Sequence, residues 1–264
     1  MEARAPLSAA VWPLVAQAAA CILMALERPS PQVQVGVAES AAISGAYVAA
    51  AAAATLLFLL LVRAGLYAVL KLIVALSALA AVEASLEFIG MPTLPALATS
   101  AVLTLLSLST GLPGNLSKSA MAASFAFLFS ALFPDHFNAV FLGLLAAYDL
   151  YSVTKGPLGS LLGEALGGPR GGRGEDGGPG ESPLDQLFVI HGPLRIGLGD
   201  LFAYSLASST SLRSLGLPLA AAPILALNVG VLATFSLLRE GKPLPGLAIP
   251  VASWGAIMAL CLIL

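Results

Sequence analysis

Charged residues are scarce in this chain of 264 residues, which has 12 basic and 14 acidic side chains, or 10% of its sequence. Soluble globular proteins carry about 25% charged residues, so these are too few to cover a water-exposed surface. The only two cysteines, Cys21 and Cys261, lie in apolar runs, which indicates small buried residues and no disulfide framework. A net charge of −2 gives no electrostatic case for nucleic acid. These absences exclude a soluble enzyme and a secreted disulfide scaffold, and we expect no nucleic-acid partner.

Long hydrophobic runs take the place of the missing charge. Hydrophobic residues make up 58% of the chain, and its mean hydropathy is +0.94. The runs extend for about 20 residues without a charge, the length that a helix needs to cross about 30 Å of hydrocarbon. The strands of a membrane β-barrel would instead alternate apolar and polar residues. We therefore expect an all-α polytopic membrane protein with nine transmembrane helices, at residues 7–26, 40–62, 66–86, 94–110, 118–133, 137–155, 194–212, 217–238 and 244–264.

A different composition separates the sixth and seventh spans. Residues 167–180 contain eight glycines and two prolines, and so have too little apolar surface to offset the entropy of ordering the chain. They predict a long flexible loop, residues 156–193, between helices 6 and 7. This loop divides the chain into a six-helix N-terminal membrane portion, residues 1–155, and a three-helix C-terminal membrane portion, residues 194–264.

Lysine and arginine residues predict the orientation of these spans. With a cytoplasmic N-terminus, ten basic residues lie on the cytoplasmic side and two on the far side, a large bias in the positive-inside sense. The ten are Arg4, Arg63, Lys71, Lys118, Lys155, Arg170, Arg173, Arg195, Arg239 and Lys242, and the two are Arg28 and Arg213. An odd number of spans then places the C-terminus outside. We expect a multi-pass protein of the cell membrane whose glycine-rich loop faces the cytoplasm.

Two aspartates stand inside the predicted spans, well away from any end. Asp149 lies six residues before the cytoplasmic end of the sixth span, and Asp200 lies six residues after the start of the seventh. At 1.5 Å per residue, both lie about 9 Å below the cytoplasmic boundary, and their antiparallel helices allow them to face each other. An aspartate at mid-helix costs roughly 2.5–3.5 kcal/mol on insertion scales, so such residues are rare and usually functional.

Three interpretations of this pair are open. Two apposed carboxylates tend to share a proton, which suits hydrolysis, because the ionised group activates a water while the protonated group protonates the substrate. The second interpretation is a proton relay in a transporter. The third is structural, with an aspartate held protonated or bonded to Tyr148 or Tyr204 between helices.

Signals that interrupt a helix accompany the two aspartates. In Gly197-Leu198-Gly199-Asp200, the glycines weaken the helix and let a backbone approach the carboxylate. Residues 243–250 open the last span with three prolines and a glycine. Proline has no N–H donor, so we expect an irregular backbone there, which is tolerated at membrane depth where it lines a cavity or meets another chain. Peptide hydrolysis needs such access, because a substrate helix must be opened before water can attack it.

These three elements, in this order, resemble the presenilin and signal peptide peptidase family of intramembrane aspartyl proteases. The family pattern is Tyr-Asp in the sixth span, Gly-x-Gly-Asp in the seventh and Pro-Ala-Leu at the start of the ninth. The matching residues are Tyr148-Asp149, Gly197-Leu198-Gly199-Asp200 and Pro245-Gly246-Leu247. The presenilin branch is the more similar, because the two aspartate motifs continue as in presenilins, through Lys155-Gly156-Pro157-Leu158 and Tyr204-Ser205, and because the expected N-terminus is cytoplasmic.

The resemblance implies an aspartic-type endopeptidase that cleaves transmembrane peptides in the lipid bilayer, with Asp149 and Asp200 both catalytic. It implies that the long loop helps to pair with the unwound substrate strand. The supporting residues would be Tyr148, Gly197, Leu198, Gly199, Pro245, Gly246 and Leu247. No cofactor or metal is expected, and a homo-oligomer or partner subunits are left open. Gly246 stands where the family has alanine, so its packing against the aspartates is an open question.

Other functions fit the same residues. A proton-coupled transporter would use the two aspartates as a relay, and a relative of the prepilin peptidases would also carry Gly-x-Gly-Asp. A scaffold or signal-sequence receptor would tolerate aspartate-to-asparagine changes without loss. Cleavage of a peptide by the purified protein in detergent separates a protease from a transporter.

Overall fold

The computed structural model describes residues 7–27, 32–109, 111–154, 185–192, 194–238 and 245–263. Within these ranges the chain forms nine α-helices: α1 (Val11–Ala25), α2 (Val37–Arg63), α3 (Tyr67–Phe88), α4 (Thr93–Ser107), α5 (Leu112–Leu132), α6 (Asp135–Thr154), α8 (Leu198–Leu215), α9 (Ala221–Leu237) and α10 (Ala248–Ile263). Two 3-10 turns, η1 (Leu7–Ala10) and η2 (Asp185–Leu187), and two strands, β1 (Phe188–His191) and β2 (Leu194–Gly197), complete the described part. The predictions for residues 155–158, 167–180 and 243–244 lie outside the described residues.

The nine helices follow the nine predicted spans in order, which confirms the all-α polytopic fold. Among the described residues, four helical segments are long and apolar enough to cross a membrane by length and composition: Ser8–Ala25, Glu39–Arg63, Tyr67–Phe88 and Asp135–Thr154. Helices α4, α9 and α10 are apolar but shorter, at 10–17 residues each. Helix α8 is more polar because it buries a run of small hydroxyl side chains against its neighbours, including Ser205, Ser208 and Ser209.

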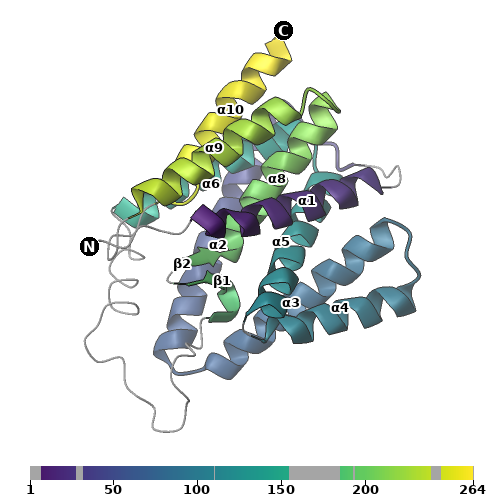
Figure 1. Cartoon of the computed structure of the whole chain (residues 1–264), viewed down its shortest axis with the longest axis vertical. Coiled ribbons are helices and arrows are strands. Elements are labelled where there is room, and N and C mark those ends of the chain that lie inside the picture. Colours follow the sequence, from purple (N-terminus) through teal and green to yellow (C-terminus); the bar gives the residue numbers. More distant parts are fainter. Residues whose placement is uncertain are drawn as a thin grey trace.

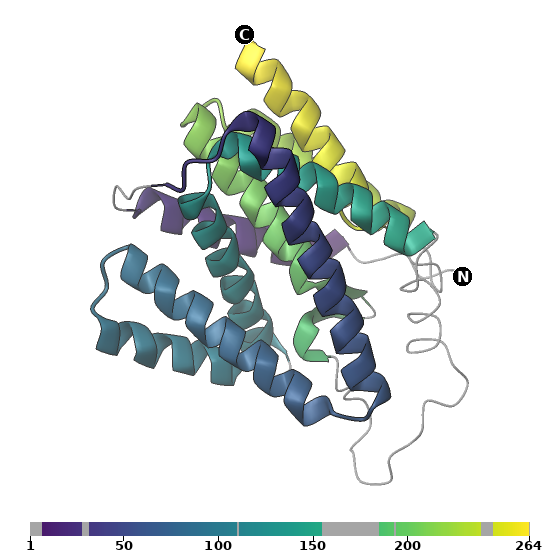
Figure 2. The same cartoon turned by 180° about the vertical axis from the view of Figure 1, so that it is seen from behind.

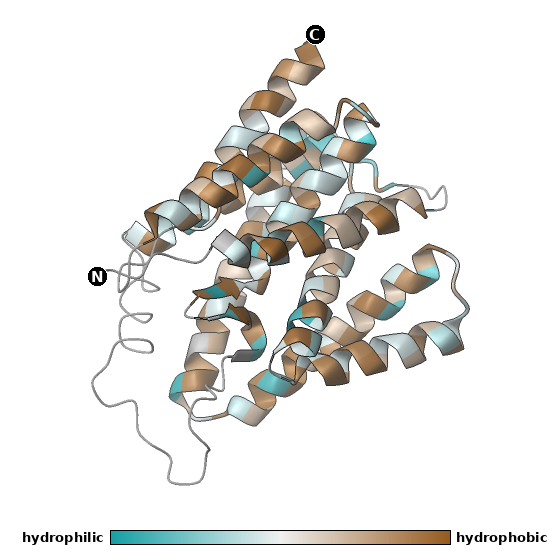
Figure 3. Cartoon of the chain, viewed as in Figure 1, coloured by the Kyte–Doolittle hydropathy of each residue, from teal (hydrophilic) through white to brown (hydrophobic). Residues whose placement is uncertain are grey.

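Helices α5 and α8 pack together at the centre of the bundle, and α1 lies across both of them (Figure 1). Helix α6 packs on α2 and α8, and α10 packs on α6, α8 and α9. The view from behind shows α2 crossing the face of the molecule, with the α3–α4 hairpin to one side (Figure 2). Apolar residues predominate along the outer helices α9 and α10, as expected for surfaces that face lipid (Figure 3).

The seventh predicted span begins later than expected, because residues 194–197 form strand β2 and the helix starts at Leu198. Strand β1 pairs antiparallel with β2, with Val189 opposite Ile196 and His191 opposite Leu194. Val189, Leu194 and Ile196 are buried in the core. The end of the loop predicted to be flexible, residues 188–191, is therefore an ordered strand. Its β-branched residues Val189 and Ile190 favour this conformation.

An aromatic cluster joins α2, α5, α6 and α8, and its members are Tyr47, Phe129, Phe133, Phe137, Phe141 and Phe202. The rings of Phe133 and Phe137 lie 4.4 Å apart between centroids, and those of Phe129 and Phe141 lie 4.8 Å apart. Phe202 of α8 meets Phe129 and Phe141 edge-on. Such aromatic pairs add about 0.5–1.5 kcal/mol each beyond the burial of their area. Because Phe202 follows Asp200 by two residues, this cluster fixes the start of α8 against α6.

Polar side chains tie α1 to α8 and α9. The amides of Gln17 and Asn228 exchange two hydrogen bonds of 3.0 Å, and Ser208 donates to the Gln17 side-chain oxygen at 3.0 Å. At the C-terminal end of α8, Arg213 forms an ion pair of 2.6 Å with Glu27. Buried polar groups need partners in a membrane bundle, so these bonds select one arrangement of the three helices.

Helices α9 and α10 approach each other closely at Gly230. A Cβ atom at this position would lie 2.6 Å from the Cα of Pro250 and 2.5 Å from the Oγ of Ser253. The Ser253 hydroxyl donates across the same interface to the carbonyl of Ala226 at 2.9 Å. A small residue thus allows the two backbones to approach, which sets the position of the segment ahead of α10.

We expect Gly230→Ala to destabilise the protein, because the Pro250 backbone cannot move aside without displacing α10. Overpacking of this kind typically costs about 1–3 kcal/mol. The measurement is the apparent melting temperature of the purified protein in detergent. Gly255→Ala on α10 is the matched control, since a Cβ there would meet nothing within 4 Å. An equal melting temperature for the two variants would contradict this packing.

Candidate active site

The C-terminal part of α6, the first turn of α8 and residues 245–247 meet at one place in the bundle. The Oδ2 atom of Asp149 accepts a hydrogen bond of 2.9 Å from the backbone N–H of Leu247, 98 residues further along the chain. The backbone amide of Gly246 also interacts with this carboxylate. Asp149 is therefore bound by the backbone ahead of α10.

Asp200 is the third residue of α8, and its carboxylate interacts with the backbone N–H of Gly197, the residue that caps the same helix. An acidic side chain at this position commonly reaches back to the cap residue. The N-terminal end of a helix also favours negative charge. The Asp200 carboxylate lies against Gly246, where a Cβ atom would be 2.9 Å from Oδ1 and 3.0 Å from Oδ2.

The two carboxylates thus contact adjacent residues, Gly246 and Leu247, and Asp149 acts electrostatically on Asp200. Both side chains are only partly buried. The structure brings the two aspartates together although Asp200 lies in the first turn of its helix, closer to the helix end than the sequence suggests. Two neighbouring carboxylates of this kind can share a proton and act as an acid–base pair.

The segment that both aspartates contact, residues 245–247, is not helical. Residues 245–247 are irregular, and α10 begins at Ala248. The N–H groups ahead of a helix have no partner within it, so those of Gly246 and Leu247 can bond to a carboxylate. The Leu247 side chain is 4% exposed and lies in the hydrophobic core, which anchors this irregular segment.

The other predicted site residues surround this contact to different degrees. Tyr148, Leu198 and Pro245 are partly buried, and Leu198 packs against the core. A Cβ atom on Gly197 would lie 3.4 Å from Asp200, whereas one on Gly199 would meet nothing within 4 Å. Gly197 has an ordinary extended conformation with φ −65°, so it supplies close approach to Asp200 and not backbone strain. Nothing in the structure explains a glycine at 199.

Tyr204 is a further residue of this site. Its hydroxyl donates a hydrogen bond of 2.8 Å to the carbonyl of Gly246, and its side chain is 1% exposed. From the sequence, Tyr204 is considered as a partner for an aspartate between helices and as part of the presenilin-like continuation after Asp200, but it is not predicted as a site residue. Its spacing is the available signal, because residues four apart on a helix share one face and Tyr204 follows Asp200 by four.

Two side chains of α5 hold the hairpin that leads to Asp200. Asn115 donates to the carbonyl of Ile190 at 2.7 Å and accepts from the N–H of Ile190 at 3.2 Å, while Lys118 donates to the carbonyl of Phe188 at 3.0 Å. Backbone groups alternate in direction along a strand, so these bonds occupy the edge of β1 that faces away from β2. Sequence reasoning misses Asn115 because the predicted fifth span begins three residues after it.

The two histidines of the chain are engaged in hydrogen bonds within the protein. His136 bonds to the carbonyl of Val35 at 3.0 Å, and His191 bonds to Ser8 at 2.9 Å and accepts from Trp12 at 3.3 Å. In the part of the chain that the structure describes, no group of three or more histidine, cysteine or acidic residues is placed to hold a metal ion.

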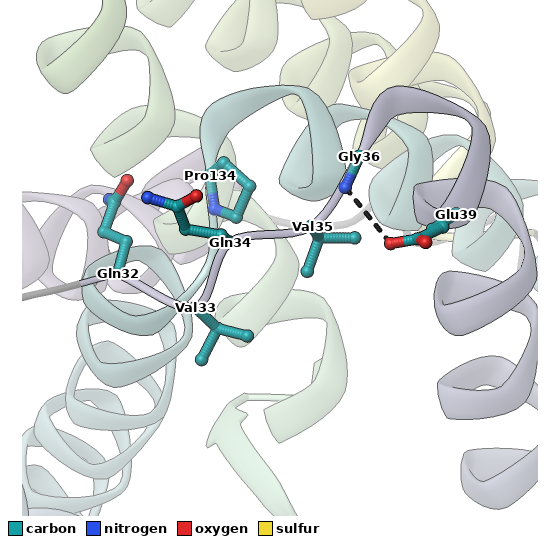
Figure 4. A pocket seen from close by; sticks show the side chains of 7 residues that line it. All are labelled: Gln32, Val33, Gln34, Val35, Gly36, Glu39 and Pro134. Carbon is teal, nitrogen blue, oxygen red and sulfur yellow. Dashed lines mark hydrogen bonds between the residues drawn. The ribbon is translucent and has the colours of Figure 1, made fainter.

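A cavity of about 840 Å³ lies far from the aspartates, at the N-terminal ends of α2 and α6 (Figure 4). It is lined by Gln32, Val33, Gln34, Val35, Gly36, Glu39 and Pro134. Asp149 lies near the opposite end of α6, about 20 Å from Pro134 along the helix axis. This cavity is therefore separate from the candidate active site.

Comparison with known proteins identifies the fold. No protein-family model matches the chain, and no curated protein sequence does. The chain is similar to a solved structure of a presenilin family intramembrane aspartate protease in space group C222, with a TM-score of 0.62, 20% identity, and coverage of 97% of this chain and 98% of that chain. A structure in space group P2 gives a TM-score of 0.66, 20% identity and 97% coverage of each chain. The chain therefore has the polytopic fold of this protease class over nearly its whole length, as its motifs predict.

We expect Gly246→Ala to lower activity with little change in stability. The added Cβ would displace the Asp200 carboxylate, which is the end of a flexible side chain and can move aside. A catalytic group that is misplaced by 1 Å can lower the rate by a factor of 10². A shift of the Asp200 carboxylate by about half that distance is therefore expected to lower kcat about tenfold. The measurement is the cleavage rate of a transmembrane peptide beside the melting temperature. Gly143→Ala, where a Cβ would meet nothing within 4 Å, is the control, and a Gly246→Ala variant as active as this control would contradict the tight contact.

Proposed function

We propose that this chain is an intramembrane aspartyl endopeptidase, which hydrolyses peptide bonds within or near transmembrane segments with Asp149 and Asp200 as its catalytic groups. The observation that carries the proposal is the convergence of both carboxylates on the backbone of Gly246 and Leu247. A presenilin-type fold over 97% of the chain supports the same activity.

The chemistry follows from the neighbouring carboxylates. In a site of low dielectric constant the pair holds one proton, because two adjacent negative charges are unfavourable. The ionised group takes a proton from water as the water oxygen attacks the substrate carbonyl, and the protonated group stabilises the carbonyl oxygen. Proton transfer to the peptide nitrogen then breaks the C–N bond and releases an acid and an amine. The N–H groups of Leu247 and Gly197 hold Asp149 and Asp200 in place for these steps.

The distribution of basic residues supports a cell-membrane protein with a cytoplasmic N-terminus and an outside C-terminus. In that orientation, Asp149 and Asp200 lie toward the cytoplasmic face. Substrates are then membrane proteins whose transmembrane segment unwinds near that face.

The hairpin of β1 and β2 is proposed to receive the unwound substrate as an added strand. Strand β2 ends at Gly197, three residues before Asp200, so a strand alongside the hairpin would lead to the aspartates. The backbone of Ile190 is already bonded to Asn115, and Val189 pairs with Ile196 in β2. A proline at either position would therefore break bonds within the enzyme, so strand addition is better tested from the substrate side.

Asp149→Ala and Asp200→Ala are each expected to lower cleavage of a transmembrane peptide by about 10³-fold or more, and the double variant should be no worse. The groups act as a unit, so removing one disables both. Products are measured by mass spectrometry with purified protein in detergent. The wild-type rate should follow a bell-shaped pH profile that reports the pair.

Asp135→Asn is the matched control, because Asp135 lies at the opposite end of α6 and bonds to Ser214 at 2.7 Å. It is expected to keep its activity. Substantial cleavage by either single aspartate variant would rule out the two-aspartate mechanism, and a transporter would cleave nothing even as wild type.

A scan of amide-to-ester replacements along the substrate is expected to lower kcat/KM at every second residue of the unwound segment. In a β-ladder only alternate residues donate to a given neighbouring strand, and an ester removes one donor while keeping the side chain. The loss per site should be about 2- to 10-fold, the worth of one hydrogen bond. The same replacements at the far end of the transmembrane segment are the control, and equal losses at all positions would contradict strand addition.

A further inference from the structure

One peptide unit at the site is hydrogen-bonded at both of its ends. The carbonyl of Gly246 accepts from the Tyr204 hydroxyl at 2.8 Å, and the N–H of Leu247 donates to Asp149 at 2.9 Å. This carbonyl and this N–H belong to the same planar amide and point in opposite directions when the peptide is trans. The amide therefore bridges α8 on one side and α6 on the other.

We propose that Tyr204 is a positioning residue that acts on Asp149 through the peptide unit between Gly246 and Leu247. Its hydroxyl holds the amide so that the Leu247 N–H meets the carboxylate. The inference rests on the proposed protease function, because Asp149 is taken as a catalytic group.

The segment on which Tyr204 acts has few restraints of its own. Pro245 has no N–H to donate, and Gly246 has no side chain to fix its backbone. The Leu247 side chain is buried, but a buried side chain alone leaves the orientation of the preceding amide free. The bonds to Tyr204 and to Asp149 are therefore the restraints that orient this amide, and the bond from Tyr204 is the one that comes from outside the pair of aspartates.

Tyr204 is well placed for this role because its own position is rigid. Its side chain is 1% exposed and belongs to the main hydrophobic core. It lies one turn after Asp200 on the same face of α8. Tyr204 bonds to the carbonyl of Gly246, and the Asp200 carboxylate lies where a Cβ of Gly246 would point. One face of α8 thus carries Asp200 itself and positions Asp149 through the peptide unit between Gly246 and Leu247.

The bond has an electronic effect as well as a geometric one. A donor on a carbonyl oxygen polarises the amide and strengthens the hydrogen bond of its N–H, by roughly 10–30% per bond in condensed phases. The Tyr204 hydroxyl therefore makes Leu247 a stronger donor to Asp149. A phenylalanine at this position would keep the ring and lose both effects.

The test is Tyr204→Phe in the full chain, assayed with a transmembrane peptide in detergent. Loss of one hydrogen bond is expected to lower kcat about 3- to 10-fold, with KM within about twofold of wild type. A second readout does not depend on catalysis: amide hydrogen exchange of residues 245–250, followed by mass spectrometry, should be faster in the variant. Tyr47→Phe is the matched control, because the Tyr47 ring packs on Phe129 and Phe133 in the aromatic cluster.

Each outcome decides the question. Wild-type kcat and wild-type exchange in Tyr204→Phe would overturn the proposal. A lower melting temperature with unchanged kcat per folded molecule would show a purely structural role, and a change in KM alone would show a role in binding, so both also overturn it. If the wild type cleaves no peptide while exchange rises in the variant, the protease function has failed and the positioning role falls with it, although the bond itself stands.

Discussion

A carboxylate inside a membrane bundle is stable only where hydrogen-bond donors surround it. This requirement explains why helices end where Asp149 and Asp200 meet. The interior of an α-helix can offer no donors, because each N–H is already bonded to a carbonyl four residues earlier. Asp149 is bound by residues 245–247, which Pro245 and Gly246 keep out of helical structure. Asp200 uses the N–H at the start of its own helix. Both aspartates therefore depend on the ends of helices.

The rest of the bundle keeps these ends within reach of one another. The aromatic cluster holds α6 against α8, and the close contact at Gly230 sets α10 beside α9. The bonds of Gln17 with Asn228 and Ser208 add α1 to the same assembly. The proposed catalytic arrangement would tolerate only displacements well below 1 Å, so packing far from the aspartates contributes to the geometry of the site.

Features that violate the local composition were open to prediction from sequence. A charge or a cluster of prolines is conspicuous in an apolar run, so Asp149, Asp200 and the break before the last helix are found without a structure. Tyr204 and Asn115 are ordinary residues at their positions, and their partners lie 42 and 75 residues away. Strand β2 is not predicted for another reason: four residues, Leu194–Gly197, are too few to distinguish the periodicity of a strand from that of the helix that follows.

The hydrogen bonds from α5 to the hairpin have a consequence for the order in which the fold assembles. A two-stranded hairpin with four residues in each strand is marginally stable by itself. Asn115 and Lys118 supply the bonds that β1 lacks, so the sheet becomes stable only once α5 has docked. Leu247, which bonds to Asp149, lies 50 residues beyond Gly197 in the chain, so this bond joins a segment made after the hairpin to α6. The backbone that both aspartates contact is therefore in place only after α5 has docked on the hairpin and residues 245–247 have packed against α6 and α8.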